Sequence, residues 1–281
     1  PVFEKALKEA KTKMAGIDLI AVTAGPGLEI ALWRGINFAR ELAHLHKKPI
    51  IGVNHLEGHI YSNWLNRIGK VFPVLNLIVS GGHTQLVLMN GHGRFKLIGE
   101  TMDDAAGEAF DKVSKMMNLG YPGGPVVSKL AEKGNPKKYN LPRPMLNQKN
   151  YNFSFSGLKT AVLYLLKDLK KRNAKVTADI CASFQQAVID VLVQKTIRAA
   201  KEHKVRSIFL SGGVSANRLL RKTLKNESKK LGVAYSQPDL EYTGDNAAMM
   251  AMAGYYKYRA TKKSDRRIEA EPNLKIKSWI R

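Results

Sequence analysis

The sequence has few acidic residues, few aromatic residues and a single cysteine. Asp and Glu number 23 against 46 Lys and Arg, so the formal net charge is +23, far beyond what solubility requires. Such an excess predicts a polyanionic partner, although an aromatic content of only 8% leaves a generally basic protein as the alternative. Cys181 cannot form an internal disulfide, and the amphipathic pattern around it predicts a core position.

The sequence also lacks a long hydrophobic run. No stretch approaches the roughly 18 consecutive apolar residues of a membrane span. Residues 1–13 form a charged helix pattern and no signal peptide. With 281 residues, 44% of them hydrophobic, the chain is long enough for one large or two medium domains. We therefore expect a globular, cytoplasmic protein without a membrane partner.

Two histidines stand four residues apart in the segment His55-Leu56-Glu57-Gly58-His59. On a helix they share one face, at the spacing that lets two imidazoles bind one metal ion. Glu57 would lie about 200° around the helix from each of them, whereas a zinc protease has its glutamate directly after the first histidine. The pattern therefore argues against a protease. Two surface histidines at helical spacing by chance are the alternative to a metal site, which would need a third ligand from elsewhere.

The order of strand-like and helix-like runs changes near residue 73. Before it, strands and helices alternate, which predicts a parallel sheet: helix 2–14, strand 17–23, glycine turn 24–27, helix 28–46, strand 49–53 and the histidine helix. After it, three runs joined by glycine turns predict an antiparallel meander: 74–80, 84–89 and 95–100. The remaining elements are predicted as helix 104–117, a short helix ending at 133, a surface connection over 135–152, helices 157–171 and 178–203, strand 207–210, helix 218–230, strand 233–236 and helix 247–259.

A weak internal repeat is visible, because the order strand, glycine turn, helix, strand, helix in residues 17–65 returns in residues 207–259. Two such copies describe an α/β protein with the duplicated two-domain fold of actin, hexokinase and Hsp70 (the ASKHA fold), with ligand in an interdomain cleft. The predicted domains are 1–72 completed by 245–281, and 73–244 with an inserted loop-helix region near 135–175. No meander precedes the first copy, so we expect the first domain to lack its initial hairpin.

Two similar turns, Ser80-Gly81-Gly82 and Ser211-Gly212-Gly213, follow strands at places that the repeat makes equivalent. Bare backbone amides in such turns can approach phosphate oxygens, so a phosphate site is predicted, with two ordinary tight turns as the alternative.

Carboxylates gather at two further places. Asp104, Glu108 and Asp111 are spaced to share one helix face, either as a solvated acidic face or as ligands of a ribose or a cation. Asp245 precedes the last helix, where it would act as N-cap or as the third metal ligand.

Several of these segments, taken together and in this order, strongly resemble the TsaD family, whose members are tRNA threonylcarbamoyltransferases. The resemblance runs from Ala24 to Ala253, and its motifs are residues 55–59, 79–86, 99–101 with 103–111, 121–125, 152–160, 211–217 and 244–246.

The resemblance implies an actin-like two-domain fold and transfer of a threonylcarbamoyl group from threonylcarbamoyl-AMP to the adenosine 3′ of the anticodon in tRNAs that read A-starting codons. It implies one metal ion, iron or zinc, on His55, His59 and Asp245, placed to polarise the carbamoyl carbonyl. It implies tRNA and small proteins of the TsaB and TsaE type as partners, and assigns no catalytic side chain. The adenylate would be held by Ile78, Val79, Ser80, Gly81, Gly82, Asp111, Gly124 and Asn217.

The sequence departs from the family pattern in two places. Ser128 stands where many relatives carry an aspartate, so one ribose contact is expected to be missing or replaced by a hydroxyl. The family's opening strand and hairpin are not found, so we expect an exposed edge on strand 17–23, weak nucleotide binding and little transfer by these residues alone. The alternatives to the transferase are a zinc endopeptidase and a sugar kinase or non-catalytic nucleotide-binding scaffold of the same fold.

Overall fold

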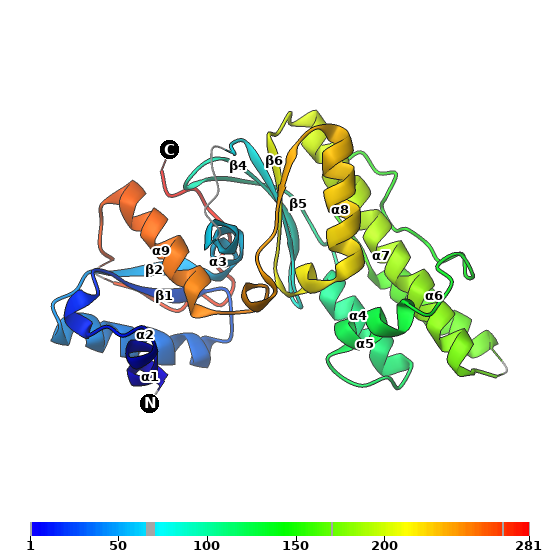
Figure 1. Ribbon diagram of the computed structural model, residues 1–281, viewed down its shortest axis with the longest axis horizontal. Helices are drawn as coiled ribbons and strands as arrows, with labels where there is room; N and C mark the ends of the chain where they lie inside the picture. The colour runs from blue at the N-terminus through cyan, green and yellow to red at the C-terminus, as the bar shows by residue number, and fades with distance from the viewer. Residues whose placement is uncertain (1, 66–70, 170, 266, 281) are drawn as a thin grey trace. The chain divides into compact units, whose positions relative to one another are not determined.

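A computed structural model gives the structure of the chain and describes residues 2–65, 71–169, 171–265 and 267–280 (Figure 1). The chain forms two compact units. Unit 1 comprises Pro1–Leu65, His92–Arg94 and Asn246–Arg281, and unit 2 comprises Asn66–Gly91 and Phe95–Asp245.

Unit 1 is built on a parallel pair of strands, with a helix on each face. Gly35 of α2 lies against the Val22 side chain, and Gly254 of α9 lies against Ala21, so the two helices cover opposite faces of β1. Helix α3 packs against α9 (Figure 1). The elements are α1 (Val2–Glu9), the 3₁₀ turn Met14–Gly16, β1 (Ile20–Gly25), α2 (Glu29–Leu45), β2 (Ile50–Asn54), α3 (His55–Tyr61), the 3₁₀ turn Ser62–Leu65 and α9 (Ala247–Thr261).

The predicted elements of unit 1 are confirmed in type and order, but helix α1 and strand β1 are both shorter than predicted. Helix α1 ends at Glu9, because Lys11 adopts a left-handed conformation with φ of 49° that stops the helix well before residue 14. Strand β1 begins at Ile20 instead of residue 17.

The outer edge of β2 is covered without a further strand. The amide of Ile50 donates to Ser264 Oγ at 3.0 Å, and the amide of Gly52 donates to Asp265 Oδ2 at 2.8 Å. Among the described residues, β1 has β2 as its strand neighbour. A hairpin completing the first sheet on the other side of β1 stays a prediction.

Unit 2 contains a five-stranded sheet in the order β5-β4-β3-β6-β7. The first three strands form the predicted antiparallel meander, and β6 then lies parallel to β3 and β7 parallel to β6. The strands are β3 (Val74–Val79), β4 (Thr84–Gly91), β5 (Arg94–Glu100), β6 (Ser207–Ser211) and β7 (Ala234–Ser236). The helices are α4 (Ala106–Met116), α5 (Gly123–Ala131), α6 (Ser156–Asp168), α7 (Ala174–Glu202) and α8 (Arg218–Leu231), with 3₁₀ turns at Gly213–Ala216 and Leu240–Tyr242.

The core of unit 2 forms around α7, which packs against α5, α6 and α8 (Figure 1). Alternate residues of the sheet, such as Leu75, Leu77 and Val79, point into this core. By length and composition α7 could cross a membrane, but 78% of its most apolar window is buried in the protein. We therefore describe α7 as a core helix. Cys181 is buried on it, as predicted, and burial raises the pKa of its thiol to about 11.

The internal repeat is visible as the order of elements. The first copy is β1, α2, β2, α3, and the second is β6, α8, β7, α9, each with parallel strands. The assignment of the copies to duplicated domains, with the boundaries given above, stays a prediction.

Candidate metal centre and substrate site

The paired histidines lie on a helix, as the spacing predicted. The Asn54 side chain caps α3 by accepting a hydrogen bond from the Leu56 amide at 2.8 Å. His55 is the first residue of α3 and His59 follows one turn later, with ring centroids 4.8 Å apart. His59 is only 1% exposed, so the chance pair of surface histidines is excluded for this residue.

A carboxylate joins the two imidazoles. One ligand atom each of His55, His59 and Asp245 lies within 4.8 Å of the others. The predicted N-cap role of Asp245 is wrong, because Asn246 caps α9 by accepting a hydrogen bond from the Met249 amide at 2.8 Å. Two imidazole nitrogens and one carboxylate oxygen form a donor set that suits zinc or ferrous iron and leaves coordination positions open.

Gly58 lets α3 approach α9 closely. A Cβ at this position would lie 2.5 Å from Met250 Sδ and 3.3 Å from Met249 Cγ. Since Asp245 is two residues before the first turn of α9, this approach also places the start of α9 near the histidines. This role of Gly58 was not predicted, although a glycine inside a helix is itself a signal of close packing.

Glu57 is directed away from a protease arrangement, as predicted. It is 3% exposed, and its Oε2 accepts a hydrogen bond from Trp279 Nε1 at 3.0 Å. Burial raises the pKa of Glu57 to about 7, although Lys257 and the Trp279 hydrogen bond lower it.

The two glycine turns lie side by side at one edge of the unit 2 sheet. Ile78 of β3 is in register with Ser211 of β6, and a Cβ on Gly212 would lie 2.4 Å from the Val79 carbonyl oxygen. Gly212 has a φ of 87°, a backbone conformation that favours glycine, at this close approach to Val79. The prediction that the turns occupy equivalent places of the repeat is wrong, since β3 and β6 are neighbours in the same sheet.

The two glycines of the first turn border open space. A Cβ at Gly81 or Gly82 would meet nothing within 4 Å among the described residues. The turn is fixed by two backbone hydrogen bonds, from the Ser80 amide to the His83 carbonyl at 2.8 Å and from the Gly107 amide to the Ser80 carbonyl at 3.3 Å. A fixed glycine turn beside open space lets an anionic group approach the backbone.

The other predicted adenylate residues form a continuous chain of contacts in unit 2. Asp111 Oδ1 accepts a hydrogen bond from the Gly123 amide at 2.7 Å, which fixes the start of α5 beside Gly124. One turn along α5, Ser128 Oγ accepts a hydrogen bond from Asn217 Nδ2 at 2.9 Å. The structure therefore brings Asp111, Gly124 and Asn217 together.

Gln185 is a member of this group that the sequence analysis missed. Its Oε1 accepts a second hydrogen bond from Asn217 Nδ2 at 2.8 Å, while Asn217 Oδ1 caps α8 through the Leu220 amide. Gln185 is 6% exposed. No local motif marks it, because it stands within the long apolar pattern of α7.

The predicted acidic face is wrong, because α4 begins at Ala106, after Asp104. Asp104 forms ion pairs with Lys112 at 2.6 Å and Lys159 at 2.8 Å, and Glu108 pairs with Lys112 at 2.7 Å. Burial opposes ionisation of Asp104, but the two lysines outweigh it and hold its pKa below the usual range. Lysines within the chain thus neutralise Asp104 and Glu108, whereas Asp111 accepts the hydrogen bond from the Gly123 amide described above.

Two solved structures share the fold. The crystal structure of T. kodakarensis HypF superposes with a TM-score of 0.65 at 16% identity, covering 87% of this chain and 41% of that chain. Full-length HypF in a phosphate- and nucleotide-bound form gives a TM-score of 0.66 at 13% identity. The superposition covers 93% of this chain and 41% of the HypF chain. At these identities the similarity shows the fold alone, and it confirms the predicted α/β class. The chain spans less than half the length of either HypF chain.

Fold and donor set together define an α/β protein with a candidate metal centre. The chain belongs to the TsaD family, tRNA N6-adenosine threonylcarbamoyltransferase, whose family model matches residues 1–252. The family's protein from Thermosipho africanus is 50% identical to this chain, over 98% of this chain and 83% of the relative's length. The protein from Geobacillus kaustophilus is also 50% identical, over 98% of this chain and 80% of the relative's length. These matches confirm the predicted family and its main function. They favour neither the endopeptidase nor the non-catalytic scaffold.

Proposed function

We propose that this chain transfers a threonylcarbamoyl group from threonylcarbamoyl-AMP to N6 of the adenosine 3′ of the anticodon in tRNAs that read A-starting codons. In this reaction the N6 nitrogen attacks the carbamoyl carbonyl, the bond from that carbon to the phosphate oxygen breaks, and AMP and a proton leave. The main support for the proposal is that the side chains of His55, His59 and Asp245 lie within metal-binding distance of one another in a chain of this family.

The adenylate would bind to unit 2. The strand end Ile78–Gly82 would hold the phosphate at its glycine turn, which borders open space, and Asp111, Gly124 and Asn217 lie in the connected group that would hold the nucleoside. Ser128 would supply a hydroxyl where many relatives carry a carboxylate. Its hydrogen bond to Asn217 supports replacement of the ribose contact instead of its loss.

His55, His59 and Asp245 would hold one divalent metal ion, Fe²⁺ or Zn²⁺. When bound, the metal supplies Lewis-acid polarisation of the carbamoyl carbonyl. The residues around it have a positioning role: the Asn54 cap and the Gly58 contact fix α3, and the Trp279 hydrogen bond holds Glu57 away from the histidines.

The tRNA would be bound through exposed basic side chains of unit 2. Basic residues are frequent in segments 167–175, 195–206 and 218–230, which makes these segments candidates for phosphate contacts. Lys195 is not available for such a contact, because it is fully buried and donates to the Asn150 carbonyl at 3.1 Å. Lys222, Lys225 and Lys229 are exposed and recur at helical spacing on α8, with no ion pair among the described residues. We propose that they contact phosphates, and that the chain works in the cytoplasm with proteins of the TsaB and TsaE type.

The test is incubation with threonylcarbamoyl-AMP, the partner proteins and tRNA, followed by nucleoside analysis. Little modified adenosine is expected from the chain alone, clearly more once a relative's opening hairpin precedes it, and none from the Asp245→Ala variant of either form. The assay is repeated on the chain preceded by a relative's opening hairpin of roughly 50 residues, a normal length within a domain. Absence of the modified nucleoside in both forms would overturn the proposed function.

A further inference from the structure

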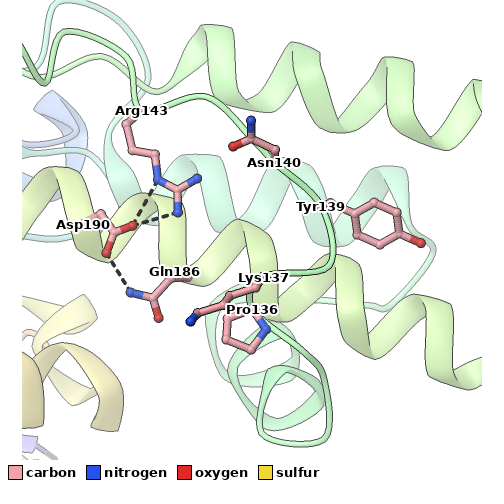
Figure 2. A pocket seen from close by; sticks show the side chains of 7 residues that line it. All are labelled: Pro136, Lys137, Tyr139, Asn140, Arg143, Gln186 and Asp190. Carbon is pink, nitrogen blue, oxygen red and sulfur yellow. Dashed lines mark hydrogen bonds and ion pairs between the residues drawn. The ribbon is translucent and has the colours of Figure 1, made fainter.

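A polar pocket of about 690 Å³ lies in unit 2, where the connection after α5 passes over α7. Its volume is within the range of small-molecule sites. None of the residues assigned above to metal or adenylate lines it. The lining residues are Pro136, Lys137, Tyr139, Asn140, Arg143, Gln186 and Asp190 (Figure 2).

The floor of the pocket is a fixed polar network. Arg143 donates from Nε and Nη2 to Asp190 Oδ2 at 3.0 and 2.7 Å, and from Nη1 to the Leu141 carbonyl. Gln186 Nε2 donates to Asp190 Oδ1 at 2.7 Å. Both side chains of the ion pair are 25% exposed. The network therefore stays partly open, with two of the five Arg143 N–H groups and Gln186 Oε1 still available.

Two further side chains at the pocket have no hydrogen bond within the described part of the chain. These are the Lys137 ammonium and the Asn140 amide, both on the exposed connection. Figure 2 shows both among the lining side chains, with Asn140 on the loop that carries Arg143. The pocket thus offers amide donors and acceptors and a net positive charge, with Pro136 and Tyr139 as its less polar parts.

This combination fits one unpaired nucleotide. Amide and guanidinium groups pair with the edges of unstacked bases, and an ammonium binds the adjoining phosphate. A bare phosphate would leave the amide groups unused.

The pocket lies next to the proposed adenylate group on α7. Gln185 contacts Asn217, and Gln186, the next residue, contacts Asp190. Consecutive helical residues point about 100° apart, so both sites lie within about one helix diameter, on the order of 10 Å.

We propose that the pocket defined by Lys137, Asn140, Arg143 and Gln186 binds one unpaired nucleotide of the tRNA loop that carries the target adenosine. The inference rests on the proposed function for the identity of the RNA. Nothing in the proposed transfer step requires these residues, so they act in substrate choice and positioning.

The test measures binding of a labelled anticodon stem-loop to the full chain, without adenylate, by fluorescence anisotropy. Asn140→Ala is expected to weaken binding about tenfold, the effect of losing one or two base contacts. Lys137→Ala is compared with Lys138→Ala, which removes the same charge from the neighbouring exposed residue outside the pocket. Thermal unfolding establishes that each variant is folded.

Stem-loops with a single abasic site at each loop position identify the bound nucleotide. One position is expected to weaken binding to the unmodified chain about tenfold and to have little further effect on Asn140→Ala. Additive losses at every position, equal losses for Lys137→Ala and Lys138→Ala, or unchanged binding by Asn140→Ala would each overturn the inference. Because binding is measured without transfer, failure of the transfer assay alone leaves this result interpretable.

Discussion

Asn217 and Ser128 are 89 residues apart in the sequence, yet the Asn217 amide donates to the Ser128 hydroxyl at 2.9 Å. The contact joins the start of α8 to the first turns of α5, beside Gly124. It places the serine, the residue that departs from the family pattern, within the group proposed to hold the adenylate.

Ser128→Ala is therefore expected to raise the KM for threonylcarbamoyl-AMP about three- to tenfold and to leave kcat nearly unchanged, because a ground-state binding contact is lost. Ser128→Thr keeps the hydroxyl and serves as the control. Steady-state kinetics separate the two constants. A fall in kcat at unchanged KM would contradict a role in nucleoside binding.

Gly58→Ala is expected to destabilise unit 1 by about 1–3 kcal/mol, because the new methyl group overlaps Met250. Gly35→Ala in α2 is the matched control, since its Cβ would meet Val22 at an ordinary 3.7 Å. That change should be neutral or stabilising by up to about 1 kcal/mol. Urea unfolding of both variants provides the measurement, and equal free energies of unfolding would show that α3 and α9 need no close approach.

Lys195 is expected to make the free energy of unfolding depend on pH. It is fully buried, and desolvation, with a contribution from Arg198, lowers its pKa to about 8, against an ordinary value of 10.5. The unfolded chain thus binds more protons between pH 8 and 10.5, so Lys195 makes the fold more stable as pH rises through that window. Below pH 8 the buried charge costs about 3 kcal/mol, since each unit of pKa shift corresponds to about 1.4 kcal/mol.

Lys195→Met removes that charge and keeps the length of the side chain. The variant should gain stability over the unmodified chain at pH 7, and the difference should shrink at pH 9.5. Chemical unfolding at both pH values is the measurement. A difference that is independent of pH would mean that Lys195 is not the titrating group.

Binding of tRNA should weaken steeply between about 50 and 200 mM salt. Replacing Lys222, Lys225 and Lys229 with glutamine should reduce the slope of log affinity against log salt by up to about 3, because each lost phosphate contact removes close to one unit. A filter-binding series gives the slope. An unchanged slope in the triple variant would place the phosphate contacts elsewhere.

The features that could be predicted from the sequence are those set by the spacing of residues along the chain and by the order of the strands and helices. His55 and His59 are four residues apart, and the three strands after residue 73 are separated by glycine turns, so both features were visible locally. The acidic face failed because capping decides where a helix starts: α4 begins after Asp104, whose carboxylate then reaches Lys112 and Lys159. Gln185 could not be found, since its role depends on Asn217, a contact that only tertiary packing creates.

The central structural claim is that His55, His59 and Asp245 form one metal centre, and elemental analysis of the purified chain tests it most directly. His44→Ala removes an exposed histidine of α2 and serves as the control for the loss of one imidazole. We expect metal bound to the unmodified chain and to His44→Ala, and most of it lost from folded His59→Ala, because one of three protein ligands is gone. Full metal occupancy in His59→Ala would show that these three residues do not form the metal centre.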